Sequence, residues 1–312
     1  MADVVLLAGG VGGAKLAHGL QAHLDDRLVV IVNTGDDLER HGMLVMPDHD
    51  TVMYTLAGLA NREWGWGVEG ETFAASEMLA RYGEPTWFRL GDQDLATHIV
   101  RMARLRAGVG LAAACVELQV ALGVPATILP MSDDPVRTQV RTDDGWLDFQ
   151  DYFVARHQEP DVHEVRFAGA AEATPAPGVV EAIDEAPLIV LAPSNPLVSI
   201  APILAVGAIS DALRRARARG VRIVAVSGIV GGKALKGPAD RMLASLGHES
   251  SALGVARLYA ELATDFVLDM VDADLSPAIE ALGLRVRVTD TVMTDDAGRA
   301  RLAGEILVDV TP

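Results

Sequence analysis

The sequence is poor in cysteine and has no long apolar run. Cys115 is the only cysteine, which excludes an internal disulfide and a cysteine-rich metal site. The apolar runs are far shorter than the ~20 residues that a membrane-spanning helix needs. The N-terminal residues also lack the basic region and the long apolar stretch of a signal peptide. We therefore expect a cytoplasmic protein with no membrane partner.

Lysine is equally scarce, and acidic side chains outnumber basic ones. The formal net charge is −17, and a surface this acidic repels phosphate backbones, which argues against nucleic acid as a partner. Only three of the 26 basic side chains are lysines, namely Lys15, Lys233 and Lys236, and all three stand in glycine-rich stretches. Coincidence in an arginine-biased chain would explain this pattern. An ammonium group among loop N–H groups is, however, a known way to hold phosphate.

The order of apolar and polar segments predicts an α/β fold. Short apolar runs at Val4–Leu7 and Leu28–Val32 enclose a helical pattern at Ala14–Leu24, which makes a strand–helix–strand unit. Strands recur at Leu188–Leu191 and Ile223–Val226. We expect one Rossmann-like, doubly wound domain over residues 1–312, with a mostly parallel sheet. The remaining predicted elements are helices at Ile203–Arg217 and Gly254–Leu262, strands at Phe266–Leu268 and Val286–Val288, and a closing helix or strand at Leu302–Val310.

Residues at about 60–170 interrupt this pattern and are expected to form a helical and β-rich insertion. Residues 51–130 look mainly helical, and residues 137–168 alternate apolar and polar side chains in places, as a small sheet does. Helical spacing is found at Thr51–Leu59, Leu95–Ala107 and Leu111–Leu122.

A run of glycines directly follows the first predicted strand, at Gly9–Lys15. Glycines let backbone N–H groups approach a phosphate, and the helix that opens here adds partial positive charge. A structural turn would need fewer glycines and no lysine, so Gly10, Gly12, Gly13 and Lys15 are predicted to bind phosphate. The glycine spacing fits neither the dinucleotide fingerprint nor the Walker A loop.

Two acidic clusters follow the glycine run. Asn33-Thr34-Gly35-Asp36-Asp37 lies at the C-terminal end of a strand, where doubly wound sheets bind their ligands, and Pro47-Asp48-His49-Asp50-Thr51 comes after it. Carboxylates without sulfur ligands suit Mg²⁺, so we expect this metal here. Helix capping by Asp37 or Asp50 is the competing explanation for a single aspartate.

Three later segments are further candidates for a binding site. In Trp87–Asp94, Arg89 stands beside aromatic residues and could clamp a planar or anionic ligand. An ordinary loop without a ligand would explain the same residues equally well. Pro193-Ser194-Asn195-Pro196 is a rigid polar turn after a strand. Ser227–Asp240 is a second glycine-rich loop with two lysines, which suggests a diphosphate or two phosphorylated ligands.

Together these segments resemble the 2-phospho-L-lactate transferase family of coenzyme F-420 biosynthesis, in the same order over residues 4 to about 270. Two departures are small: Ser227-Gly228-Ile229 stands where Ser-Pro-Ile is common, and Lys236 replaces a more variable position. The resemblance is carried by Gly-Gly-Val-Gly-Gly-Ala-Lys, Asn-Thr-Gly-Asp-Asp, Pro-Asp-His-Asp-Thr-Val-Met-Tyr-Thr-Leu-Ala-Gly, Trp-Phe-Arg-Leu-Gly-Asp-Gln-Asp-Leu-Ala-Thr-His, Ala-Pro-Ser-Asn-Pro-Leu-Val-Ser-Ile and Val-Gly-Gly-Lys-Ala-Leu-Lys-Gly-Pro-Ala-Asp.

The resemblance implies a Mg²⁺-dependent transfer between two small molecules. The donor would be a guanosine diphosphate-linked three-carbon phosphoacid: 2-phospho-L-lactate, phosphoenolpyruvate or 3-phosphoglycerate. The acceptor would be the ribityl hydroxyl of 7,8-didemethyl-8-hydroxy-5-deazariboflavin, and GMP would be released. A homodimer is also expected.

The same resemblance assigns roles by position. Asp36 and Asp50 are implied as catalytic residues and metal ligands, and the insertion as part of the acceptor site. Asp50, Trp87, Arg89 and Asp92 are implied as acceptor-binding residues. The implied nucleotide-binding residues are Gly10, Gly12, Gly13, Lys15, Asn33, Thr34, Ser194, Asn195, Gly232 and Lys233.

Two other classes of protein remain open at this point. A nicotinamide-dependent dehydrogenase would use Gly9–Gly13 for the pyrophosphate and Asp36 or Asp37 for the ribose, although the glycine spacing and the second lysine loop count against it. A non-catalytic regulator that binds nucleotide sugars would share the loops. The Trp87–Asp94 segment favours the enzyme over the regulator.

Overall fold

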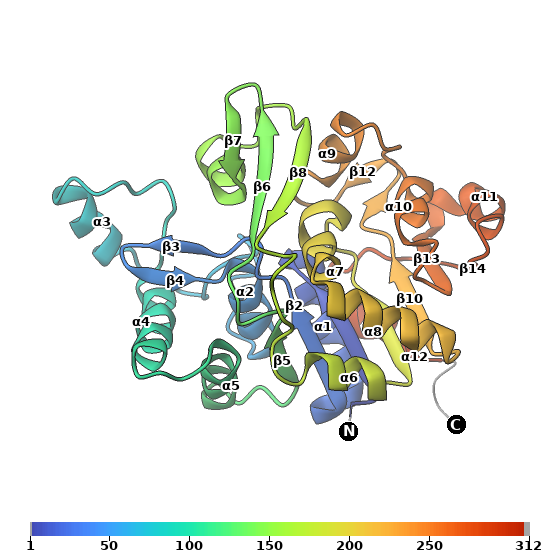
Figure 1. The fold of residues 1–312 in the computed structure, drawn as a ribbon, viewed down its shortest axis with the longest axis horizontal. Coiled ribbons are helices and arrows are strands. Elements are labelled where there is room, and N and C mark those ends of the chain that lie inside the picture. The colour runs from blue at the N-terminus through green and yellow to red at the C-terminus, as the bar shows by residue number, and fades with distance from the viewer. Residues whose placement is uncertain (1, 309–312) are drawn as a thin grey trace.

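The computed structural model describes residues 2–308, and its framework is a seven-stranded parallel sheet (Figure 1). The strands lie in the order β14-β13-β10-β9-β1-β2-β5. All six neighbouring pairs are parallel, which confirms the predicted α/β, doubly wound fold. The strand bounds are β1 Val4–Ala8, β2 Leu28–Val32, β5 Thr127–Pro130, β9 Leu188–Leu191, β10 Arg222–Val226, β13 Asp265–Asp269 and β14 Arg285–Thr289.

Strand β1 is apolar at every position because both of its faces are buried. Val5 and Leu7 point into a core shared with α6 (Val179–Glu185) and α8 (Gly207–Ala218). Val4 and Leu6 point into a second core shared with α1 (Gly10–Leu24) and α12 (Asp296–Leu307). Helices therefore cover both faces of the sheet, so every residue of β1 is buried (Figure 1).

The order of the strands creates a crevice at one place on the sheet edge. From β1 the chain moves outward through β2 and β5, and then returns to β9 on the other side of β1 and continues through β10, β13 and β14. The loops that leave β1 and β9 consequently diverge to opposite faces of the sheet. Doubly wound folds bind their ligands at such a switch point, outside the carboxyl ends of the strands.

Several elements begin or end away from their predicted positions. Helix α1 starts at Gly10 rather than Ala14, so the glycines form its first turn. Helix α2 (Pro47–Leu56) starts before Thr51, because Pro47 occupies the first helical position that proline favours. Strand β5 lies inside the stretch predicted as an insertion, and pairs with β2 in the main sheet. Helix α12 begins before Leu302, and residues 309 and 310 of the predicted closing element lie outside the described residues.

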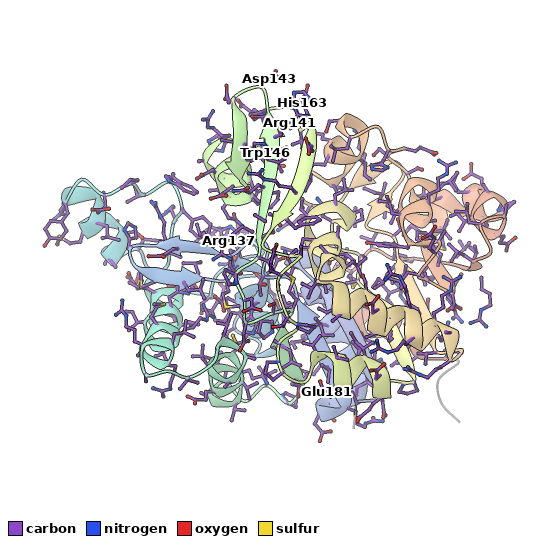
Figure 2. The ribbon with its side chains drawn as sticks, viewed as in Figure 1. Arg137, Arg141, Asp143, Trp146, His163 and Glu181 are labelled. Carbon is purple, nitrogen blue, oxygen red and sulfur yellow. The ribbon has the colours of Figure 1, made fainter. Side chains whose placement is uncertain are left out.

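Two excursions leave the sheet, one before and one after β5 in the sequence (Figure 1). The first contains a hairpin and helices, and α3 in it extends furthest from the sheet. The second is the expected small β-rich unit, a three-stranded antiparallel sheet that carries Arg141, Asp143 and His163 near its tip (Figure 2). The elements are β3 Leu38–Arg40, β4 Met43–Val45, α3 Ala74–Arg81, α4 Asp92–Arg106 and α5 Leu111–Ala121 in the first, and β6 Arg137–Thr142, β7 Gly145–Asp148, η2 Asp151–Ala155 and β8 Glu164–Ala168 in the second.

The C-terminal half adds short elements around β9 to β14. Within residues 2–308 no single helix is long and apolar enough to cross a membrane. The helices Pro196–Ala205 and Gly207–Ala218 reach that length and apolarity only when they are counted together, and the chain bends by 91° between them. The remaining elements are η1 Asp25–Arg27, η3 Pro196–Ile200, α7 Ala201–Ala205, β11 Ile229–Val230, β12 Lys233–Ala234, α9 Ala239–Ser245, α10 Ala252–Tyr259, η4 Met270–Leu275 and α11 Ser276–Glu280.

Candidate active site

A cavity of about 520 Å³ lies at the switch point between β1 and β9. Its walls come from the loops after both strands, from the first turn of α2, and from the two excursions. Of the residues predicted from sequence, eight line it: Gly10, Gly12, Asp36, Asp50, Trp87, Arg89, Ser194 and Asn195. Among the described residues the walls do not include Gly13, Lys15, Asn33, Thr34, Asp92, Gly232 or Lys233.

The loops after β1 and β9 are joined to each other directly. The hydroxyl of Ser194 donates to the carbonyl oxygen of Gly9 at 2.7 Å and accepts from the Gly9 N–H at 3.3 Å. A Cβ atom on Gly12 would lie 2.3 Å from the carbonyl oxygen of Pro193, so only glycine fits there. Gly10 adopts a φ of +61°, which also favours glycine. The glycines therefore allow α1 to start in contact with the second loop.

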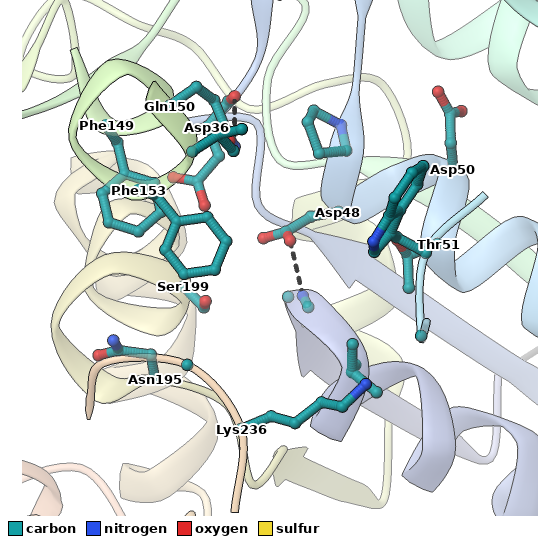
Figure 3. A pocket seen from close by; sticks show the side chains of 18 of the residues that line it. Asp36, Asp48, Asp50, Thr51, Phe149, Gln150, Phe153, Asn195, Ser199 and Lys236 are labelled. Carbon is teal, nitrogen blue, oxygen red and sulfur yellow. Dashed lines mark hydrogen bonds between the residues drawn. The ribbon is translucent and has the colours of Figure 1, made fainter. Parts of the chain in front are cut away.

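Asp48, which the motifs did not single out, occupies the centre of the cavity (Figure 3). Its Oδ1 accepts from the N–H of Gly10 at 2.7 Å and its Oδ2 from the side-chain amide of Asn33 at 2.9 Å. Burial raises the pKa of Asp48 to about 6, although these two hydrogen bonds oppose the rise. A negative charge placed at a helix N-terminus is stabilised by the helix dipole.

Asp36 lies beside Asp48 and is also buried. Burial, followed by the negative charge of Asp48, holds the pKa of Asp36 well above its usual range. One carboxylate oxygen of Asp36, Oδ1, has no hydrogen-bond partner. Two buried carboxyl groups that repel each other, one of them with an unpartnered oxygen, suit a divalent cation with oxygen ligands.

Asp50 has a different environment, although it stands only two residues from Asp48. Both of its oxygens bind the guanidinium group of Arg101, with Nη1 3.1 Å from Oδ2. Burial alone would raise the pKa of Asp50. The guanidinium of Arg101 and a hydrogen bond with His49 outweigh burial and hold that pKa below its usual range. Asp50 is therefore an ionised carboxylate with its counter-charge already in place.

The predicted Trp87–Asp94 segment is split between the cavity and the surface. The guanidinium of Arg89 lies 3.9 Å from the ring centre of Phe73, and that of Arg40 lies 4.9 Å from the ring of Trp87. Asp92 points elsewhere: its carboxylate accepts from the N–H groups of Ala74 and Ala75, each at 3.0 Å, at the start of α3. Because its exposed carboxylate accepts these two hydrogen bonds, Asp92 caps α3 and lies outside the cavity.

The three lysines also separate. Lys15 donates to the carbonyl oxygen of Met293 at 3.0 Å, and Lys233 is 80% exposed, with Asp240 3.6 Å away. Lys236, which is not among the implied nucleotide-binding residues, lines the cavity and donates to the carbonyl oxygen of Trp64 at 2.9 Å. Of the three lysines, only Lys236 in the second glycine-rich loop therefore lies in the cavity wall.

Aromatic rings form two walls that sequence reasoning did not assign. Trp64 and Trp66, in the loop after α2, stack with their ring centres 5.3 Å apart. Phe149 and Phe153 stack at 5.5 Å on the side of the cavity formed by the small sheet (Figure 3). Figure 3 shows Asp48 between Phe153 on one side and Thr51 on the other. The Trp64-Gly65-Trp66-Gly67 segment is distinctive in the sequence, whereas nothing local distinguishes Phe149 and Phe153 from core residues.

The comparisons with known proteins agree with the motifs. Residues 4–296 match the family model described as 2-phospho-L-lactate transferase CofD. A phosphoenolpyruvate transferase from Streptomyces griseus subsp. griseus is 46% identical over 311 residues, which cover 97% of each chain. A 2-phospho-L-lactate transferase from Methanosarcina acetivorans is 40% identical over 301 residues, 96% of each chain. These matches confirm the resemblance.

A solved structure resembles the fold at much lower sequence identity. A protein of the upf0052 family from Bacillus halodurans superposes with a TM-score of 0.61 at 16% identity, and the match covers 98% of both chains. This likeness supports the architecture alone.

Proposed function

The chain belongs to the 2-phospho-L-lactate transferase family and is a transferase of coenzyme F-420 biosynthesis, and from this premise we propose which molecules it joins. A guanosine diphosphate-linked three-carbon phosphoacid gives its phosphoacid to the ribityl hydroxyl of 7,8-didemethyl-8-hydroxy-5-deazariboflavin, and GMP leaves. The names of the relatives support phosphoenolpyruvate first and 2-phospho-L-lactate second. The third acid, 3-phosphoglycerate, rests on the resemblance of the motifs alone.

One observation carries this proposal: the cavity has two unlike halves that meet at Asp48. The donor half contains the α1 N-terminus, Ser194 and Lys236, which are groups that bind phosphate oxygens. The acceptor half contains half-exposed aromatic rings and the ionised Asp50, which suit a flat ring with a hydroxylated tail. A transfer between a polyanion and a planar alcohol needs both halves in one cavity.

Mg²⁺ fits the carboxylates at the junction. Asp36 and Asp48 would hold it, because their raised pKa values reflect a shortage of positive charge around buried carboxyl groups. The motifs suggested Asp50 as the second ligand; we prefer Asp48, because Asp50 already has the positive charge of Arg101 beside it, whereas Asp48 accepts only from neutral N–H donors. When bound, the ion would neutralise charge that develops on the diphosphate.

The residues of the chain position the donor and the acceptor and exclude water from the reacting groups. The N–H groups in the first turn of α1 that do not bond to Asp48, together with the ammonium of Lys236, hold the diphosphate. Asp50 accepts a hydrogen bond from the attacking hydroxyl and directs its oxygen toward the donor phosphorus. The low pKa of Asp50 makes it an orienting group in preference to a strong base. Direct transfer follows, without a covalent enzyme intermediate.

The test is a product assay with each acid in turn. The purified chain is mixed with the guanylyltransferase, GTP, Mg²⁺, the deazaflavin acceptor and one of the three acids, and the product is identified by mass. We expect a phosphodiester of the deazaflavin that forms fastest with phosphoenolpyruvate and about 100-fold more slowly with Asp36→Asn. Consumption of neither acceptor nor donor with any of the acids would refute the proposal.

The expected homodimer remains part of the proposal. Light scattering coupled to size exclusion should give twice the mass of one chain, and the mass of one chain would refute it.

A further inference from the structure

A buried polar group behind the acceptor half has, apart from Asp50, no role in the reaction described so far. Asp50, Asp94 and His98 each offer one atom within 4.8 Å of the others, and all three residues line the cavity. Asp50 belongs to the first turn of α2, whereas Asp94 and His98 lie one turn apart on α4. By spacing alone this group could hold a metal ion.

The surroundings of His98 argue against a metal. Its Nδ1 lies 3.2 Å from Nη1 of Arg101, and a guanidinium can only donate. The ring therefore presents a lone pair at Nδ1 and carries its proton on Nε2, which faces Oδ1 of Asp94 at 3.3 Å. A metal would need a lone pair at Nε2 and would add a second cation beside the buried guanidinium. Arg101, and not a metal, supplies the positive charge beside these side chains.

Arg101 fixes the orientation of Asp50. The side chain of Arg101 is completely buried, and its Nη1 also donates to the carbonyl oxygen of Leu44 at 3.2 Å. The guanidinium is thereby anchored to the β4 backbone, to His98 and to both oxygens of Asp50. A planar group with several fixed donors holds a carboxylate in one orientation, as the compact ammonium of lysine cannot.

Asp94 is held in a similar way. The hydroxyl of Tyr54 donates to Oδ1 of Asp94 at 2.8 Å, and Oγ1 of Thr97 lies 2.8 Å from the same hydroxyl. The backbone N–H of Asp94 donates to Glu71 at 2.7 Å. Two carboxylates thus line one end of the cavity at a short and fixed separation. An ionised carboxylate only accepts hydrogen bonds, so a matching ligand must bring two donors.

We propose that Asp50 and Asp94 form a clamp for two hydroxyl groups of one polyol chain, with Arg101 as its positioning residue. This inference rests on the proposed function, in which the acceptor carries a ribityl chain. Each carboxylate accepts one O–H hydrogen bond, and the fixed separation selects hydroxyls on nearby carbons. A site built to bind hydroxyls rejects an analogue that lacks them, because its own acceptors are then left without partners.

The test compares two acceptors that both keep the terminal hydroxyl. One is the deazaflavin with its ribityl chain, and the other carries a 5-hydroxypentyl chain. The wild type should prefer the ribityl acceptor by roughly 30-fold in kcat/KM. Asp94→Ala should reduce this preference to within about threefold and leave the KM of the donor unchanged. Asp94→Asn, which keeps the shape, should give an intermediate preference if the alanine variant does not fold.

Arg101 is tested by rescue. Arg101→Met should raise the KM of the ribityl acceptor by about tenfold and lower the preference, and Arg101→Lys should recover part of both. Arg217→Lys is the matched control, since Arg217 is an arginine on α8 that binds the carbonyl oxygens of Ala260 and Ala263. It should change the melting temperature alone. An equal loss in Arg101→Met and Arg101→Lys, with the preference intact, would reduce Arg101 to a structural role.

Two outcomes would overturn the clamp. The first is an unchanged preference in both Asp94 variants. The second is Mn²⁺ binding, measured by calorimetry, that disappears in Asp94→Ala, because the group would then be a metal site. Failure of the proposed function is distinguishable, since the wild type would then transfer to neither acceptor. In that case ribitol alone should still raise the melting temperature of the wild type but not of Asp94→Ala, and no difference would reject the clamp.

Discussion

The two halves of the cavity are built from different materials. The donor half consists mainly of backbone: the glycine turn at the start of α1 packs directly against the loop after β9. The acceptor half consists of side chains that meet across long sequence separations, such as Asp50 with Arg101. Backbone binding requires glycine at fixed places and tolerates little else. Side-chain binding requires a supporting network behind each contact, and single contacts can be exchanged.

This difference predicts that the donor half is the more fragile of the two. Gly12→Ala should have the largest effect, because its Cβ would lie 2.3 Å from a backbone oxygen of Pro193 that cannot rotate away. We expect a loss of about 1–3 kcal/mol in the free energy of unfolding and loss of guanine nucleotide binding. Thermal melts and GDP calorimetry measure both.

The matched control is Gly207→Ala, where no atom lies within 4 Å of the added Cβ. It should leave nucleotide affinity unchanged. If both alanine variants bind GDP as the wild type does, the two loops do not form a tight phosphate site.

The junction of the halves should show the next largest effect. Asp36→Asn and Asp48→Asn should each lower kcat by about 100-fold without unfolding the protein, because an amide cannot supply the charge that a metal needs. Removing one of two carboxyl groups that repel each other should leave the melting temperature of the metal-free protein equal or higher. Steady-state rates with excess Mg²⁺ and thermal melts without it are the measurements. Turnover close to the wild type in either variant would remove that residue from the metal site.

The pKa of Asp48 gives this junction a pH dependence. Its folded value of about 6 lies above the usual 3.8, so a proton competes with the metal below about pH 6. Affinity for Mg²⁺ should fall by about tenfold per pH unit below that point. In the metal-free protein the same shift means that stability from this carboxyl is complete below about pH 4 and is lost as the pH rises through about 6.

Calorimetry at pH 5.0 and 7.5 tests the pH dependence, with Asp48→Asn as the control. The variant should show a weak affinity at both pH values. Equal Mg²⁺ affinity of the wild type at the two pH values would contradict the assignment.

Substitutions of the lysines should have the smallest effects. They distinguish Lys236, which lines the cavity, from Lys15 and Lys233, which do not. Lys236→Met should weaken GDP binding by about tenfold, because Lys236 alone of the three lines the cavity. Lys233→Met should change little, since an exposed pair such as that with Asp240 contributes at most about 1 kcal/mol. Lys15→Met should lower stability more than affinity, because Lys15 bonds to Met293. GDP calorimetry on the three variants measures these changes in affinity. An effect of Lys233→Met equal to that of Lys236→Met would contradict the expected order.

Local sequence patterns predicted the strands and the glycine turn, whereas the contacts between side chains far apart in the sequence could not be predicted, for a physical reason. The apolar runs that form β1, β2, β9 and β10 and the glycine turn are local patterns, because a buried strand and a positive φ each require particular residue types within a short stretch of sequence. The choice between Asp48 and Asp50 is not local. It depends on Arg101, which lies about 50 residues later on another helix. Strand β5 was missed since only its pairing with β2 distinguishes Thr127–Pro130 from the end of a helical stretch.

The most direct test of the two-half account is a crossed titration. GDP affinity by calorimetry and deazaflavin affinity by fluorescence are measured for the wild type, Lys236→Met and Arg89→Ala, since both residues line the cavity. The account predicts that Lys236→Met weakens GDP alone and that Arg89→Ala weakens the deazaflavin alone, each by about tenfold. It is contradicted if either variant weakens both ligands equally, because the donor and acceptor would then share one site.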